Sequence, residues 1–181
     1  MELDNIIYPG FNKTLSELNA ISKIKKKSCE IVDLTEIEWV RDVLRHRVEE
    51  VGTYDIKFRK PTDEEIKSVS EIVGADINID ELKNNFHKNK RIIGITSGKG
   101  GVGKSTITSL LGIAFDELGK KVGIMDSDIW GYSVPKILGA KFPPIPFNER
   151  IFPSRINNLN VISMDYFCLL YTSDAADDRM R

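Results

Sequence analysis

Hydrophobic positions near the start of the chain predict a mixture of strands and one strong helix. Over residues 36–51, apolar side chains recur at spacings of three, four or seven, and Gly52 follows as a stop signal. This spacing is typical of an amphipathic helix. Weak alternation of apolar and polar residues over 29–34 and 54–59 predicts two strands. We therefore expect a small α+β domain over residues 1–60.

The following stretch, residues 61–90, has few apolar residues among many charges. Thr62 and Glu65 have the S/T-x-x-E spacing of a capping box, which predicts a helix start. A second short helix is expected over 80–87. We interpret the whole stretch as a helical linker.

The pattern changes after residue 90. A short apolar run at 92–95 precedes a glycine-rich loop, and 105–118 then shows helical spacing. Residues 122–125 form a second short apolar run, and 159–164 is a candidate third strand. Strand, helix and strand in succession predict a right-handed βαβ unit. The expected fold class is thus α/β, with a small α+β domain followed by a mostly parallel sheet over 91–167.

Composition narrows the functional classes. The chain has 181 residues, 41% of them hydrophobic, and 26 basic side chains balance 27 acidic ones. Such a balance argues against a globally basic nucleic-acid binder. No apolar run is long enough to span a membrane, and the first residues do not resemble a secretory signal. We expect a cytoplasmic protein with no nucleic-acid and no membrane partner. Two cysteines are too few for a disulfide framework or a metal ribbon.

The glycine-rich loop carries the clearest chemistry. Residues 98–105 fit G-x-x-x-x-G-K-[ST], in which backbone N–H groups close around phosphate oxygens. Lys104 would supply a charge to the β- and γ-phosphates, and the Ser105 hydroxyl suits Mg²⁺. We therefore expect ATP and Mg²⁺ as cofactors. The residues expected to bind the nucleotide are Gly98, Lys99, Gly100, Gly101, Val102, Gly103, Lys104, Ser105 and Thr106.

Two carboxylates end the second predicted strand of this domain. Asp126 and Asp128 follow residues 122–125 directly. Carboxylates at the C-terminal end of a parallel strand beside such a loop face the nucleotide crevice. One can hold a water bound to Mg²⁺, and the other can orient the attacking water.

The loop GKGGVGKST resembles the deviant Walker A motif of the dimerising P-loop ATPases, such as the nitrogenase iron protein, MinD, ParA and Mrp. In that group the early lysine reaches the partner's phosphates, which implies a homodimer and a catalytic role for Lys99. The resemblance also implies that Asp128 orients the attacking water. Asp126 and Ser105 are then expected to bind Mg²⁺. Lys99, Lys104 and Asp128 are the catalytic residues that we expect.

The segment DSDIWGYSVP, from Asp126 to Pro135, resembles the D-A-D-I-Y-G-P-S-x-P stretch of Mrp/ApbC-type proteins. That resemblance covers 91–167, and Tyr132 departs from it where the family has proline. Members are ATPases that carry iron–sulfur clusters to apoproteins. The resemblance therefore implies apoprotein clients and a cluster as cargo in a full-length protein.

Many bacterial members begin with a small domain of the iron–sulfur-assembly type, and residues 8–60 resemble a diverged copy. That domain has a Thr-x-x-x-Cys-Pro segment where residues 34–39 here contain neither cysteine nor proline. We interpret Cys29 as a small core residue, and His46 and His87 as isolated surface residues. No iron–sulfur ligand is expected in this chain.

The last 14 residues, 168–181, match no family pattern, and CLLYTSDAADD resembles a translated sequencing adapter. We expect a non-native tail, and Cys168 is not expected to be a cluster ligand. The family's Walker B strand and Cys-x-x-Cys are missing. The chain is therefore interpreted as an N-terminal fragment, inactive as it stands, with exposed apolar edges in 91–167.

Two alternative functions stay open. A ParA/MinD-type positioning ATPase would need a C-terminal amphipathic helix or basic patch in place of Cys-x-x-Cys. A non-enzymatic adaptor would use the N-terminal domain to bind partners while the ATPase half decays. The intact loop and the Asp126–Asp128 pair argue against decay.

Overall fold

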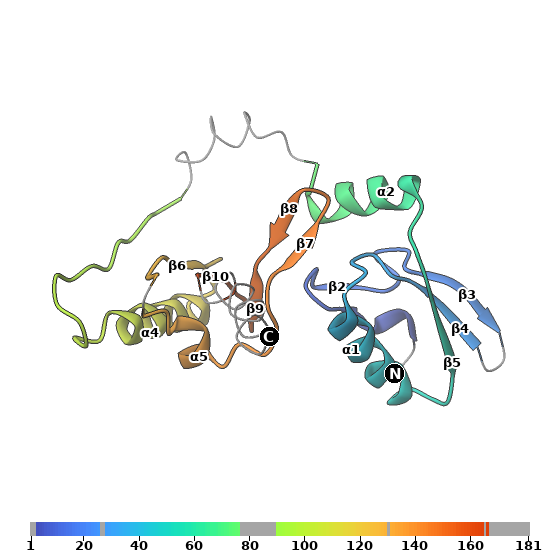
Figure 1. The fold of residues 1–181 in the computed structure, drawn as a ribbon, viewed down its shortest axis with the longest axis horizontal. Helices are drawn as coiled ribbons and strands as arrows, with labels where there is room; N and C mark the ends of the chain where they lie inside the picture. Colours follow the sequence, from blue (N-terminus) through green and yellow to red (C-terminus); the bar gives the residue numbers. More distant parts are fainter. Residues whose placement is uncertain (1–2, 26–27, 77–89, 130, 165, 167–181) are drawn as a thin grey trace, which may run out of the picture. The chain divides into compact units, whose positions relative to one another are not determined.

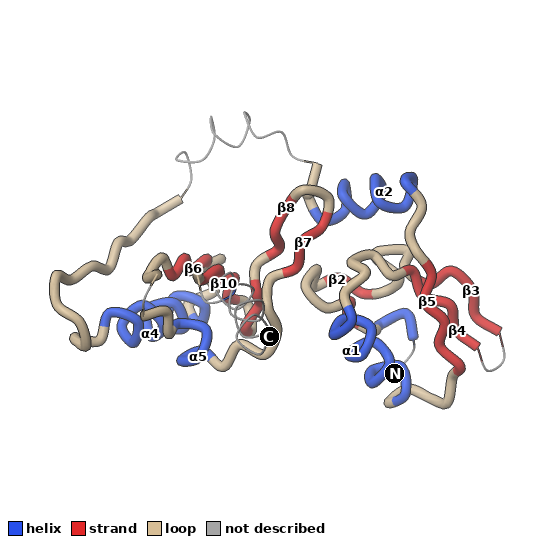
Figure 2. Tube along the Cα trace, in the orientation of Figure 1, coloured by secondary structure: helices blue, strands red, loops and turns tan. Residues whose placement is uncertain are grey.

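A computed structural model describes residues 3–25, 28–76, 90–129, 131–164 and 166. The helix expected over 80–87 and the tail expected over 168–181 lie outside these residues. The chain forms two compact units, one of Met1–Asn89 with Ile145–Phe152, the other of Lys90–Pro144 with Pro153–Arg181. Both units contain helices and strands, so the expected mixed α/β class is confirmed (Figure 1, Figure 2).

The first unit is built on a three-stranded sheet. Its central strand β4 (Ser28–Val32) runs antiparallel to β3 (Ile21–Lys25) and parallel to β5 (Asp55–Arg59). A short pair, β1 (Ile7–Tyr8) and β2 (Lys13–Thr14), follows the 3₁₀ turn Leu3–Asn5. The strands expected over 29–34 and 54–59 are thus confirmed within a residue or two at each end.

Helix α1 (Glu38–Glu49) confirms the strongest helical pattern of the sequence. It buries Val40, Leu44 and Val48, which are spaced by four residues and so lie on one face. This face packs into the core of the first unit together with Ile31 and Leu15. The apolar face expected from the spacing is therefore the face that is buried, which explains why this helix could be predicted from spacing alone.

Helix α2 (Asp63–Val73) begins with the predicted capping box. The Thr62 hydroxyl accepts a hydrogen bond from the Glu65 backbone N–H at 3.3 Å, and the Glu65 carboxylate accepts one from the Thr62 N–H at 2.9 Å. Gly74, with φ of 73°, ends the helix in the left-handed region. Val69 is buried in the core of the first unit. This part of the stretch expected as a linker therefore belongs to the first unit.

A hairpin from the middle of the expected ATPase domain also belongs to the first unit. Strands β7 (Ile145–Phe147) and β8 (Arg150–Phe152) pair antiparallel. Asn148 and Glu149 join them with φ of 45° and 59°. Two consecutive positive φ values fit a type I′ turn, the tight turn that suits the twist of a hairpin. No pattern in the sequence predicted this hairpin.

The second unit combines helix α4 (Lys104–Glu117), the short helix α5 (Val134–Leu138) and a three-stranded sheet. In the sheet, β10 (Leu159–Ser163) lies between β6 (Gly123–Asp126), which is parallel to it, and β9 (Ser154–Ile156), which is antiparallel. The small core holds Ile124, Val134, Leu159 and Val161. The predicted helix and the strands over 122–125 and 159–164 are confirmed.

One predicted strand is wrong. Residues 92–95 form no helix or strand, and Ile92 is 70% exposed. A strand is stabilised by hydrogen bonds to a neighbouring strand, and within the described residues none pairs with this segment. Apolar composition alone therefore did not suffice to form the strand. In the described part of the chain, no helix is long and apolar enough to cross a membrane.

Candidate functional site

The glycine-rich loop leads directly into helix α4. Gly101 and Gly103 have φ of 75° and 91°, a region that strongly favours glycine because a side chain would strain the backbone. Lys104 is the first residue of the helix, and the Ile107 N–H donates to the Gly103 carbonyl at 2.9 Å. The two glycines thus turn the chain so that the loop ends at a helix N-terminus.

Within the described residues, the start of α4 has no side-chain hydrogen-bond cap, and its first turn carries no acidic residue. The hydroxyls of Thr108 and Ser109 instead donate to the carbonyls of Lys104 and Ser105, both at 2.8 Å. The first N–H groups of a helix have no partner inside the helix and carry its positive dipole end. This arrangement favours an anion such as a phosphate.

The first half of the loop lies at the surface. Gly98, Lys99 and Gly100 are exposed, and Lys104 and Ser105 are partly buried. The Lys99 backbone N–H donates to the Ser97 hydroxyl at 3.2 Å, which ties the residues before the glycines into a turn. The structure therefore brings the expected nucleotide-binding residues together in one continuous loop and helix start, with Lys99 exposed.

Asp126 is held by four hydrogen bonds. The residue is buried, with 8% of its surface exposed to solvent. One carboxylate oxygen, Oδ2, accepts from the backbone N–H groups of Ser133 and Val134, both at 3.2 Å. The Ser163 hydroxyl donates to the same oxygen at 3.3 Å. The buried carboxylate thus fixes the start of α5 and joins it to the end of β10.

Asp128 lies in the loop between β6 and α5. Its backbone N–H donates to Oδ1 of Asp126 at 3.3 Å, so the structure brings the two aspartates together. Its own Oδ1 accepts from the Gly131 N–H at 2.9 Å. A side chain on Gly131 would approach this carboxylate to 3.2 Å, so glycine lets the loop close tightly. In the described part of the chain, the hydrogen bonds to the Asp126 carboxylate come from this loop, α5 and β10, and none of these four comes from residues 98–106.

The oxygen groups of Ser105 and Asp126 are of the kind that Mg²⁺ prefers. The carboxylate of Asp126 is buried and accepts four hydrogen bonds, and the chemical kind of its oxygens and of the Ser105 hydroxyl fits a nucleotide-bound Mg²⁺. In the described part of the chain, no group of three or more His, Cys, Asp or Glu side chains could hold a metal ion by itself. Any magnesium here would therefore depend on phosphate oxygens as well.

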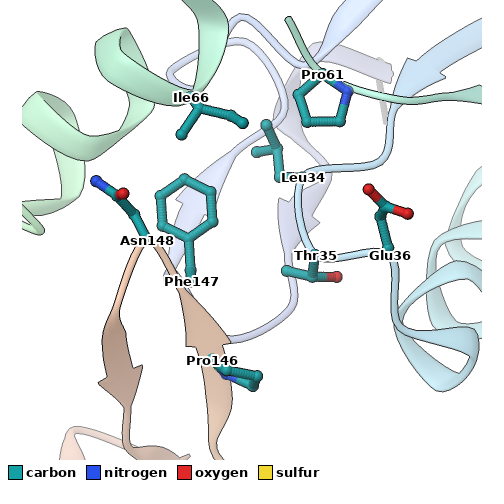
Figure 3. Close-up of a pocket in the computed structure, with 8 residues that line it drawn as sticks. All are labelled: Leu34, Thr35, Glu36, Pro61, Ile66, Pro146, Phe147 and Asn148. Carbon is teal, nitrogen blue, oxygen red and sulfur yellow. The ribbon is translucent and has the colours of Figure 1, made fainter. Parts of the chain in front are cut away.

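The first unit has a cavity that no pattern in the sequence predicted. It measures about 300 Å³ and opens beside the turn before α1 (Figure 3). Its lining comes from that turn, from α2 and the segment that leads into it, and from the β7–β8 hairpin: Leu34, Thr35, Glu36, Pro61, Ile66, Pro146, Phe147 and Asn148. The cavity escaped prediction because its walls come from segments far apart in the sequence.

The turn before α1 is held by Asp33, which accepts from the Glu36 backbone N–H and from the Arg41 guanidinium. The Tyr8 hydroxyl accepts from the Leu34 N–H at 3.0 Å, and burial raises the pKa of Tyr8. Cys29 is buried, and burial raises the pKa of its thiol, which fits the interpretation as a core residue.

Comparisons with known proteins agree with these features. Residues 88–175 match the family model described as "ParA: NUBPL iron-transfer P-loop NTPase". An iron-sulfur cluster carrier protein of Aquifex aeolicus is 30% identical over 172 residues, which cover 87% of this chain and 47% of the relative. That of Helicobacter pylori is 29% identical over 90% of this chain and 45% of the relative. No solved structure matches.

Over shorter stretches the identity is higher. The iron-sulfur cluster carrier protein of Rickettsia bellii is 44% identical over 84 residues, or 46% of this chain and 26% of the relative. The chain thus spans less than half the length of the curated relatives that it matches. The resemblance found in the sequence is confirmed over residues 88–175, just under half of the chain: this segment, which contains the glycine-rich loop, α4 and the paired aspartates, matches the family model of iron-transfer P-loop NTPases.

Proposed function

We propose that this chain carries the nucleotide-binding part of an ATPase that assembles iron–sulfur clusters and transfers them to apoproteins. The observation that carries the proposal is the Gly98–Thr106 loop, which ends at the uncapped N-terminus of α4. Glycine-rich backbone, helix dipole and Lys104 together supply the groups that bind phosphates. Relatives of similar sequence are named iron-sulfur cluster carrier proteins.

Within this proposal each site residue has one role. Lys104 neutralises charge on the β- and γ-phosphates, and the Ser105 hydroxyl and Asp126 carboxylate serve Mg²⁺. Asp128 orients the attacking water, and its place beside Asp126 supports that role. The bound Mg²⁺ would offset the negative charge that develops during phosphoryl transfer. Hydrolysis of ATP by the full-length protein follows from these roles.

The exposure of Lys99 supports a role in trans. A lysine at the second position of the loop that lies at the surface is available to a second copy of the protein. We therefore propose that the full-length protein is a homodimer in which Lys99 reaches the partner's nucleotide. The cluster itself is cargo, and its ligands are proposed to lie outside this chain. Apoproteins that need clusters would be the clients.

The proposal for the first unit is a diverged iron–sulfur-assembly domain that handles no metal. The turn at Thr35, where the resembled domain has its cysteine segment, is held by Asp33 and Tyr8. The second unit is proposed to be the start of a mostly parallel P-loop sheet, which the parallel pair β6–β10 supports.

The test of nucleotide binding is a titration of this chain with a fluorescent ATP analogue and Mg²⁺. Lys104→Ala removes a charge-assisted contact worth about 1.5–3 kcal/mol, so the Kd is expected to rise by about 10- to 100-fold. Lys121→Ala is the matched control, because this exposed lysine lies in the same unit but outside the loop.

Equal affinity of the original chain and Lys104→Ala for the nucleotide would overturn the loop as the binding site.

A positioning ATPase and a cluster carrier share this loop, so cluster loading separates the two functions. The full-length protein, reconstituted with iron and sulfide, is expected to transfer a cluster to an apoprotein. A full-length protein that hydrolyses ATP but holds no cluster would favour the positioning ATPase. A Lys104→Ala protein that keeps its cellular role would favour the adaptor.

A further inference from the structure

The β7–β8 hairpin is an integral part of the first unit. Phe11 packs against Phe147 and Phe152, each with ring centroids 5.1 Å apart and rings nearly perpendicular. Edge-to-face pairs of this kind add stability beyond the burial of their area. A side chain on Gly10 would lie 2.1 Å from Cδ1 of Ile145, so glycine is needed for the hairpin to pack this closely.

Polar contacts fix the hairpin along its length. The Asn148 amide at the turn donates to the buried Ser70 hydroxyl of α2 at 2.8 Å, and that hydroxyl donates to the Ile66 carbonyl at 2.7 Å. The Arg150 guanidinium donates to the Ala75 carbonyl at 3.3 Å, just after α2. The hairpin therefore has one defined docked position, set by apolar and polar contacts together.

The two ends of the hairpin continue into the second unit. There the Ser154 hydroxyl, at the start of β9, donates to the Phe142 carbonyl at 2.7 Å and joins the incoming and outgoing chain. Ser154 is opposite Val161 of β10, and Ser163 of β10 is opposite Asp126 of β6. Strand pairing thus connects the outgoing end of the hairpin to Asp126.

The incoming end reaches Asp126 by a second route. The chain enters β7 from α5, and the first N–H groups of α5, from Ser133 and Val134, both donate to Oδ2 of Asp126. Ser163 donates to the same oxygen. One carboxylate, beside the proposed water-orienting residue Asp128, therefore holds both segments that carry the hairpin.

We propose that docking of the hairpin in the first unit and nucleotide binding at the loop oppose each other, with Asp126 as the positioning residue shared by both. This proposal rests on the proposed function. Oδ2 of Asp126 already accepts three hydrogen bonds. An interaction that draws this carboxylate toward a bound nucleotide weakens its hold on α5 and β10, and so loosens the hairpin. Coupling between two binding equilibria is reciprocal.

Because the coupling is reciprocal, weaker docking of the hairpin is expected to tighten nucleotide binding. Phe147→Ala weakens docking by removing a buried ring from the Phe11 contact. The full chain with this change is expected to bind fluorescent ATP with Mg²⁺ more tightly than the original chain, by about fivefold or more. Ile151→Ala is the matched control, because Ile151 lies on the same hairpin and is 53% exposed. Its Kd is expected to stay within about twofold of the original.

Amide hydrogen exchange measures the reverse effect. Saturating ATP and Mg²⁺ are expected to speed exchange of the amides of Ile145–Phe152 in the original chain. A second variant guards against unfolding of Phe147→Ala, which far-UV circular dichroism would reveal. Asn148→Gly removes the hydrogen bond to Ser70 and keeps the positive φ. It is expected to tighten nucleotide binding in the same direction by a smaller factor.

Each outcome has one meaning. If the original chain binds nucleotide, but neither variant changes the Kd and hairpin exchange is unchanged, the coupling is wrong and the proposed function stands. If both variants weaken binding, the opposition is wrong. If the original chain binds no nucleotide at any concentration, the proposed function and the coupling both fall.

Discussion

The two units bury their apolar residues to very different extents. Among the described residues, the core of the first unit has 18 buried side chains, drawn from its helices, its sheets and the β7–β8 hairpin. The core of the second unit has four among those described. Helices α1 and α4 make the contrast plain: Leu44 of α1 is 0% exposed, whereas Leu110 of α4 is 59% exposed. Both residues were predicted to lie on apolar faces.

The difference between α1 and α4 shows which property of a helix the spacing of its apolar residues predicts. The spacing of apolar residues determines which face of a helix is apolar. It does not determine whether another element covers that face. In α1 that face lies in the core of the first unit, whereas Ile107 and Leu110 of α4 are at least half exposed within the described structure. The first unit should therefore dominate the stability of this chain.

The largest expected effect is a loss of stability from the first unit. Leu44→Ala removes a fully buried side chain and should lower the free energy of unfolding by about 2–5 kcal/mol. Leu110→Ala on α4 should change it by less than about 0.5 kcal/mol. Urea unfolding followed by far-UV circular dichroism, which reports on the helices of both units, measures both. Equal losses would contradict the contrast between the units.

The next effect tests the hairpin as part of the first core. Gly10→Ala places a methyl group against Ile145 and should cost about 1–3 kcal/mol beyond the backbone strain at its φ of 86°. Gly119→Ala is the control, because its φ is 72° and a side chain there would meet open space. Urea unfolding compares the two. If the two changes cost the same, the close packing of Ile145 on Gly10 does not exist in solution.

A smaller effect depends on pH. The Arg59 guanidinium and the Thr62 backbone N–H lower the pKa of Glu65 to about 2. Because this pKa is below the unfolded value, the ionised carboxylate stabilises the fold above pH about 4.5, and the stabilisation is lost as the pH falls toward 2. Glu65→Gln should therefore cost on the order of 1–2 kcal/mol at pH 6, after allowance for partial exposure of the pair.

The difference between Glu65→Gln and the original chain should shrink steadily between pH 4.5 and about 2. Urea unfolding at several pH values measures it. Glu64→Gln, on the exposed side of the same helical turn, serves as the control. A cost for Glu65→Gln that does not change with pH would show that its carboxylate is not the stabilising group.

Much of the first unit and of the loop could be predicted because local signals determine them. The Thr62 capping box, the apolar face of α1 and the glycines before Lys104 each act within a few residues of chain. The sequence could not reveal contacts made at long range. Phe147 lies in a strand of three residues, too short for a periodic pattern, and its partner Phe11 is far away in the sequence.

The same reasoning explains the failure at residues 92–95. Their apolar composition favours a strand, but a strand needs a partner, and none of the described strands pairs with them. At Asp126 the prediction was partial: its place at a strand end was foreseen, and its hold on Ser133, Val134 and Ser163 was not. That hold depends on how the chain folds back after β6.

Nucleotide binding at the loop is tested most directly by amide hydrogen exchange across residues 98–107, with and without ATP and Mg²⁺. Exchange there is expected to be slower when nucleotide is present, because phosphate oxygens would accept from the loop and from the first N–H groups of α4. The amides of β3 and β4 should not change. Unchanged exchange in the loop at saturating nucleotide would contradict the claim that this loop binds ATP.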